Sequence, residues 1–109
     1  MTEAEIIHQV WKLCQEILGP QYRLFLFGSR SEKKNDSYSD FDFLIKGAAV
    51  VPDKSWQRFF DAVQEIQTLF KIDLVDYMGA SEDFKKVASK SLKEIVNGQI
   101  RPASGTSTT

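Results

Sequence analysis

At 109 residues, the chain is expected to form one compact domain rather than several. Its 14 Lys and Arg residues nearly balance its 15 Asp and Glu residues, which argues against direct binding of a long nucleic acid. The single cysteine, Cys14, excludes an internal disulfide and is expected to be a buried, inert thiol. No apolar run approaches the roughly 18 residues that span a bilayer, so we expect a cytoplasmic protein without membrane contact.

The first half of the chain predicts a helix followed by two strands. Apolar residues recur every three or four positions over residues 3–18, which indicates an amphipathic helix. Gly19 and Pro20 follow it and are typical of a helix end. The continuous apolar run at residues 23–27 predicts a central strand. After a polar loop, residues 41–46 predict a second strand.

The second half predicts a helix, a third strand and a last helix. Large apolar residues form one face of a helix over residues 55–70, and the run KIDLVDY at residues 71–77 predicts a strand. Ser81 is a suitable N-cap for a last helix over residues 82–96.

The domain is expected to end shortly after this last helix. Asn97 and Gly98 are residues typical of a helix end, so the predicted domain covers residues 1–98. Residues 99–109 have no apolar periodicity and are expected to form a disordered tail. The predicted fold class is α+β, a small mixed sheet of about three strands flanked by helices. The predicted order is helix, strand, strand, helix, strand, helix.

The predicted topology brings several polar residues to one edge of the sheet. The second strand, its following helix and the third strand form a βαβ unit with parallel strands and a right-handed crossover. If the first strand pairs antiparallel with the second, the Gly28-Ser29 turn lies beside Asp40 and Asp42. The start of the third strand, with Asp73, arrives at the same edge.

The acidic residues at this edge suggest a cation site. Asp40 and Asp42 share a strand face because they are two residues apart. At about 4 Å and an effective dielectric of 20, unpaired carboxylates repel by about 4 kcal/mol, so a bound cation explains the pair most simply. The phase of the third strand places Asp73 on the same face. Asp76 falls on the helix-covered face, where we expect a cap or a salt bridge.

The Gly-Ser turn suits a phosphate ligand next to such a cation. Gly28 lets a backbone approach closely, and Ser29 offers a hydroxyl and an amide. Arg30, Lys33 and Lys34 add positive charge, although a lysine pair in a polar loop is more commonly a solvated surface. Three carboxylates form the oxygen-rich site that Mg²⁺ prefers, and two ions there suit an in-line displacement.

At these residues the sequence resembles the nucleotidyltransferase superfamily that has the DNA polymerase β palm fold. More narrowly, it resembles the minimal nucleotidyltransferases, the MNT proteins encoded beside HEPN-domain partners. The resemblance covers residues 6–97 and depends on Gly28, Ser29, Asp40, Phe41, Asp42 and Asp73.

The resemblance implies an activity and a set of site residues. It implies transfer of a nucleotidyl group, AMP from ATP, to a hydroxyl, with two Mg²⁺ ions held by Asp40, Asp42 and Asp73 as the catalytic residues. In HEPN/MNT toxin–antitoxin pairs the implied acceptor is a tyrosine of the HEPN protein. The nucleoside triphosphate would be held by Gly28, Ser29, Arg30 and Ser39.

The loop after the Gly-Ser turn departs from the pattern of many family members. Where these continue Arg-Ala-Arg-Gly, this chain has Arg30-Ser31-Glu32-Lys33. An acid therefore replaces a base and the following glycine is missing, which affects the expected loop geometry and triphosphate affinity but not the acidic residues.

Several functions stay open at the level of sequence. The chain has no residues left for an acceptor domain, so the acceptor surface is expected from a HEPN-domain partner or from a homodimer. One alternative is a non-catalytic module that neutralises a HEPN partner by complex formation. Another is a small-molecule nucleotidyltransferase subunit, and the plainest is a structural domain with incidental surface acids.

Overall fold

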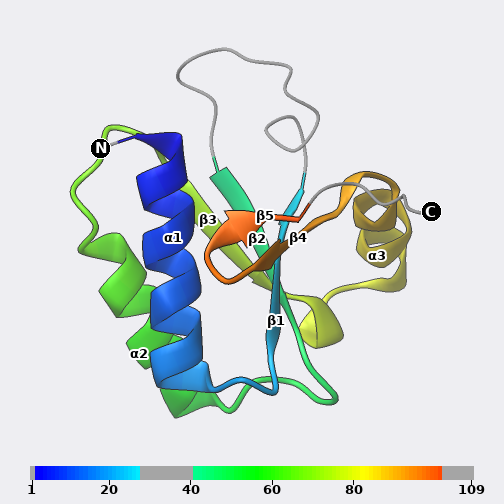
Figure 1. The fold of residues 1–109 in the computed structure, drawn as a ribbon. Coiled ribbons are helices and arrows are strands. Elements are labelled where there is room, and N and C mark those ends of the chain that lie inside the picture. Colours follow the sequence, from blue (N-terminus) through cyan, green and yellow to red (C-terminus); the bar gives the residue numbers. More distant parts are fainter. Residues whose placement is uncertain (1, 28–40, 102–109) are drawn as a thin grey trace.

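The computed structural model describes residues 2–27 and 41–101 (Figure 1). In this part of the chain, one mixed sheet of five strands has the order β3-β2-β1-β4-β5. Helices α1 and α2 cover one face of the sheet, and α3 lies against the other. The elements are α1 (Glu3–Leu13), a π-helical turn (Cys14–Leu18), β1 (Arg23–Phe27), β2 (Phe41–Lys46), α2 (Asp53–Gln64), β3 (Ile72–Asp76), α3 (Glu82–Ala88), β4 (Lys93–Val96) and β5 (Gln99–Ile100).

The central three strands pair as the sequence predicts. Strand β1 runs antiparallel to β2, and β2 runs parallel to β3 after the α2 crossover. This pairing places Phe27 opposite Asp42 and Asp42 opposite Asp73. The mixed α+β fold class is therefore confirmed.

Alternation along the strands divides the apolar residues between two cores. Phe41, Phe43 and Ile45 of β2 are fully buried against α1 and α2. Phe25 and Leu44 point to the opposite face and pack with Ala88 of α3. Because both faces are covered, β1 and β2 read as nearly continuous apolar runs.

The prediction of a last helix over residues 82–96 is wrong beyond Ala88. Residues 93–100 form the hairpin β4–β5, with Asn97 and Gly98 as its turn at φ values of 54° and 78°. Asn-Gly is the strongest short signal for such a turn because both positions need positive φ. Ile95 pairs with Leu24 of β1 and is only 3% exposed, so burial against the sheet outweighs the helical pattern. The sheet thus continues beyond residue 98, and residues 102–109 of the predicted tail lie outside the described part.

Two other helices differ from their predicted lengths. The first is α-helical to Leu13 and continues as a π-helical turn to Leu18. Helix α2 ends at Gln64 rather than at residue 70. After the helix, Phe70 packs edge-on against Phe41, with 5.3 Å between ring centroids, before β3 begins.

Local side-chain contacts define the helix starts. Thr2 and Glu5 form a reciprocal capping box at α1, and the Ser81 hydroxyl accepts a hydrogen bond from the Phe84 N–H at α3. The Ser81 cap was predicted. Within residues 2–27 and 41–101, no helix has both the length and the apolar character needed to cross a bilayer.

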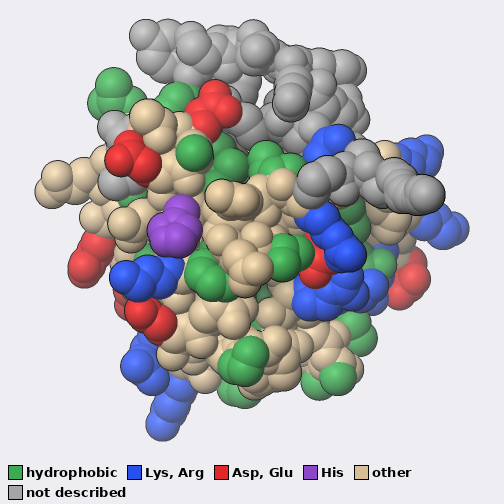
Figure 2. Space-filling model, in the orientation of Figure 1, with side chains coloured by type: hydrophobic (Ala, Val, Ile, Leu, Met, Phe, Trp, Pro, Cys, Tyr) green, Lys and Arg blue, Asp and Glu red, His purple; other side chains and the backbone are tan. Residues whose placement is uncertain are grey.

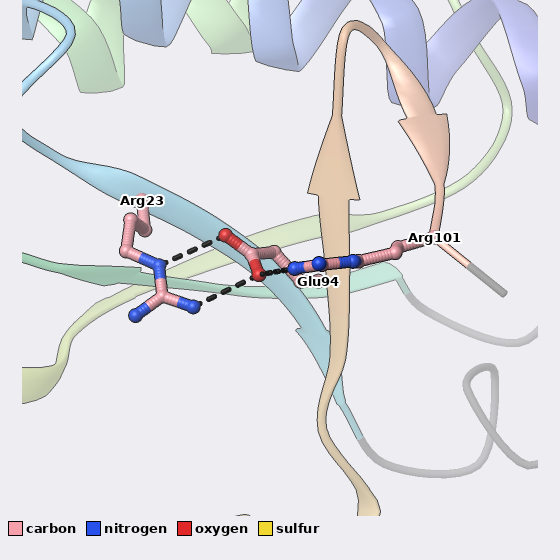
Figure 3. Close-up of polar contacts among 3 residues, drawn as sticks. All are labelled: Arg23, Glu94 and Arg101. Atoms are coloured by element: carbon pink, nitrogen blue, oxygen red, sulfur yellow. Dashed lines mark hydrogen bonds and ion pairs between the residues drawn. The ribbon is translucent and has the colours of Figure 1, made fainter. Parts of the chain in front are cut away.

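An ion pair links the β4–β5 hairpin to the neighbouring strand β1 (Figure 3). Arg23 of β1 donates two hydrogen bonds of 2.9 Å to the Glu94 carboxylate of β4. Arg101, just after β5, donates a third of 3.0 Å to the same group. The Arg23 guanidinium is the main cause that lowers the pKa of Glu94 below its usual 4.5.

Candidate active site

Asp42 and Asp73 lie next to each other at one end of the sheet. They are direct partners in the parallel ladder between β2 and β3. Residues paired in this way project from the same face, here the face that also carries Phe25 and Leu44. Both are partly exposed, and the Asp73 side chain is 42% exposed. Two neighbouring carboxylates open to solvent have the oxygen donors that fit a hard divalent cation.

The other face of β2 holds this pair in place. Phe41 and Phe43, on either side of Asp42, are fully buried and stacked with ring centroids 5.9 Å apart. The Phe41 N–H donates a 2.8 Å hydrogen bond to the carbonyl of Lys71, which continues the ladder to the start of β3. Buried anchors on one face therefore define where the carboxylates emerge on the other.

Two residues beside the acidic pair were not predicted as site residues from the sequence. Phe27, opposite Asp42, meets Phe84 of α3 edge-on at 5.5 Å, so an aromatic contact lies beside the carboxylates. The Lys71 ammonium lies 4.0 Å from the Asp73 carboxylate. The sequence could have predicted this ion pair, because Lys71 and Asp73 are two positions apart and side chains two apart in a strand share a face.

Asp76 points to the opposite face, as the strand phase predicted. Its carboxylate accepts a 2.8 Å hydrogen bond from the Val51 N–H, two residues before α2. Its second oxygen is buried and has no hydrogen-bond donor among the described residues. Asp76 therefore ties the loop before α2 to β3 and does not join the acidic pair.

The remaining predicted site residues lie outside the described residues. They are Gly28, Ser29, Arg30, Ser39 and Asp40. Only two of the three predicted metal ligands belong to residues 2–27 and 41–101, and no cluster of three His, Cys, Asp or Glu side chains occurs there.

Comparison with known proteins identifies the fold and the family. The family model described as "Polymerase beta, Nucleotidyltransferase" matches residues 12–100, which include Asp42, Asp73 and the hairpin. This chain belongs to that family. The resemblance inferred from the sequence motifs is therefore confirmed.

One relative of this member of the polymerase β nucleotidyltransferase family is the probable protein adenylyltransferase MntA of Haemophilus influenzae. It is 33% identical over 73 residues, which are 67% of this chain and 64% of that protein. The aligned stretch is thus less than two thirds of the relative's own length.

Solved structures share the fold of this chain at lower identity. One is a toxin–antitoxin crystal structure with AMP-PNP, with a TM-score of 0.60 and 22% identity over 85% of this chain and 72% of that one. Another is a tri-AMPylated Shewanella oneidensis HEPN toxin in complex with its MNT antitoxin, with a TM-score of 0.58 and 21% identity. That match covers 85% of this chain and 71% of the other.

Proposed function

We propose that this chain is a Mg²⁺-dependent nucleotidyltransferase that transfers AMP from ATP to a hydroxyl of a partner protein, with pyrophosphate released as the bond between the α- and β-phosphates breaks. The observation that carries the proposal is the direct pairing of Asp42 with Asp73 at the end of the sheet. The family match over residues 12–100 and the relative named as a protein adenylyltransferase support it.

In this proposal the acidic residues would hold the metal ions, and the Gly-Ser turn would hold the triphosphate. Asp40, Asp42 and Asp73 would hold two Mg²⁺ ions, which when bound neutralise the triphosphate and help to activate the attacking hydroxyl. Asp73 also orients the acceptor hydroxyl and takes up its proton. The triphosphate would be held by Gly28, Ser29, Arg30 and Ser39.

We propose a HEPN-domain protein as the acceptor, with this chain as the antitoxin of a toxin–antitoxin pair in the cytoplasm. The support is the relative's name together with the shared fold of the MNT antitoxin that was solved with a HEPN toxin. A homodimer is the other assembly that could complete the acceptor surface.

The test is transfer of labelled AMP to a HEPN-domain protein of the same genome, with ATP and Mg²⁺. Asp42→Asn and Asp73→Asn should each lower the transfer rate by about 100-fold or more, because each removes a carboxylate from the site. Asp61→Asn is the matched control, since this α2 residue is remote from the pair and its oxygen can still accept from Gln57.

Two results would decide against transfer. One is the absence of label on the partner with the unaltered chain. The other is full neutralisation of the partner's toxicity by the double variant Asp42→Asn/Asp73→Asn, which would establish the alternative of a non-catalytic binding module.

A further inference from the structure

Charge is unevenly distributed between the two sides of the sheet. From the start of α3 at Glu82 to Arg101 there are five basic residues and three acidic ones, Glu82, Asp83 and Glu94. On the other side, residues 3–18 and 53–65 contain three basic residues and six acidic ones. Figure 2 shows many Lys and Arg side chains on the right, over α3 and the hairpin, with a few acidic side chains among them, and both signs on the left over α1 and α2. A near-neutral chain therefore has a basic side.

On the basic side, two lysine ammonium groups lie against the ring of one tyrosine. The ammonium groups of Lys46 and Lys85 lie 4.7 Å and 5.3 Å from the centroid of Tyr77. Lys85 is only 18% exposed, and its ammonium lies 3.4 Å from the Glu82 carboxylate. Arg23 is the direct cross-strand partner of Lys46. The Arg23 guanidinium is already paired with the Glu94 carboxylate, so Lys46 is the member of this cross-strand pair whose charge faces Tyr77.

The outer surface of α3 adds exposed charge and one apolar residue. Lys86 of α3 and Lys90, in the 3-10 turn Ser89–Ser91 that directly continues the helix, are both exposed. Val87 lies between them and is 68% exposed. We call Lys86, Val87 and Lys90 the basic strip.

The basic strip belongs to the layer that also borders the acidic pair. Phe84, at the start of α3, contacts Phe27, and Phe27 is the ladder partner of Asp42. A ligand lying along α3 would therefore reach the same sheet face from which Asp42 and Asp73 project.

The chemistry of the strip favours a protein over a nucleic acid. Binding of nucleic acid usually combines a basic domain with open aromatic rings, but the sequence pI is about 5.8. The rings nearest the strip, Phe84 and Tyr77, are packed into the smaller core. An acidic peptide segment with one apolar side chain would satisfy both the lysines and Val87.

We propose that the basic strip docks an acidic segment of the acceptor protein and so directs that protein toward Asp42 and Asp73. This inference depends on the proposed function for the identity of the acceptor. Opposite charges steer association, so their contribution appears mainly in the association rate and weakens with added salt.

The experiment measures association of the full chain with a HEPN-domain protein of the same genome, by stopped-flow fluorescence at low and high salt. Lys86→Gln/Lys90→Gln should lower the association rate constant by about tenfold at low salt and by much less at high salt. Lys12→Gln/Lys54→Gln, which removes two exposed lysines from α1 and α2, should leave it within about twofold. Val87→Ser should increase the dissociation rate without changing the salt dependence.

The outcomes separate this inference from the proposed function. Equal effects of the two lysine pairs, or no effect of either, would overturn the docking surface. Loss of binding to single-stranded oligouridine in Lys86→Gln/Lys90→Gln, with protein association unchanged, would overturn it in favour of a nucleic-acid site. Binding that follows the expected pattern without any AMP transfer would contradict the enzyme proposal and leave the docking surface supported.

Discussion

At the scale of single residues, burial determines the reactivity of the Cys14 thiol. The side chain is fully buried among the apolar residues of α1 and the sheet. Burial raises the pKa of the Cys14 thiol to about 12, so the reactive thiolate is scarce at neutral pH. The position of Cys14 in an apolar helical pattern was enough to predict this.

We therefore expect native Cys14 to resist thiol reagents. Reaction with Ellman's reagent at pH 8 should be slow in the folded chain and complete within minutes in guanidinium chloride, because unfolding exposes the side chain. The measurement is absorbance of the released thiolate over time. Rapid reaction of the folded chain would show that the thiol is accessible.

Asp76 is a second residue whose role depends on its surroundings. Asp76→Ala removes the acceptor for the Val51 N–H and should lower the free energy of unfolding by about 1–3 kcal/mol. Asp76→Asn keeps an oxygen acceptor and should cost less. Urea denaturation followed by circular dichroism measures both, and equal losses in the two variants would argue against the hydrogen bond.

At the scale of elements, the hairpin β4–β5 depends on its turn and on its attachment to β1. The turn has positive φ at Asn97 and Gly98, a region that glycine adopts freely because it lacks a β-carbon and that Asn and Asp tolerate better than other residues. The attachment is the carboxylate of Glu94 between two guanidinium groups. Each feature can be removed separately.

Gly98→Ala should destabilise the chain by about 1–2 kcal/mol. The new β-carbon would overlap the imidazole of His8 and would be strained at a φ of 78°. Gly79→Ala is the control, because a β-carbon there meets nothing within 4 Å. Thermal unfolding of the two variants compares them, and similar melting temperatures would contradict the prediction.

Glu94→Gln should lower the free energy of unfolding by about 1 kcal/mol at pH 7, since both arginines are largely exposed and screening limits each pair. The folded-state pKa of Glu94 lies below the usual 4.5. Its stabilising contribution is therefore present above that usual value and is lost as the pH falls through the lowered folded-state value.

The check on Glu94 is urea denaturation of both proteins across this range. The difference in stability between the original chain and Glu94→Gln should be largest at neutral pH and should shrink below about pH 4.5. A difference that stays constant from pH 7 to pH 3 would show that charge is not its cause.

At the scale of the whole molecule, one sheet separates two chemically different layers. The α1 and α2 layer covers Phe41, Phe43 and Ile45 and forms the larger core. The face toward α3 has a smaller core, and Asp42 and Asp73 project from the same face. The buried layer thus fixes the strands, and the partly exposed carboxylates Asp42 and Asp73 lie on the other face.

Much of this arrangement was determined by the sequence alone. Strands β1 and β2 match their predicted bounds because a continuous apolar run covered on both faces permits few other structures. The strand period also placed Asp42 and Asp73 on one face and Asp76 on the other, because side chains alternate along a strand.

Only the tertiary structure determined the conformation of residues 89–100. Their apolar residues fit a helical period, but β1 had an edge that needed a partner, and β4 fills it with Ile95 buried in the core. Asn97-Gly98 is compatible with either a helix end or a hairpin turn, so the local signal left two solutions. Burial of Ile95 and backbone pairing with β1, about 70 residues away in the sequence, favour the hairpin over the helix. The basic residues of this segment therefore lie on one side of the sheet, with α3.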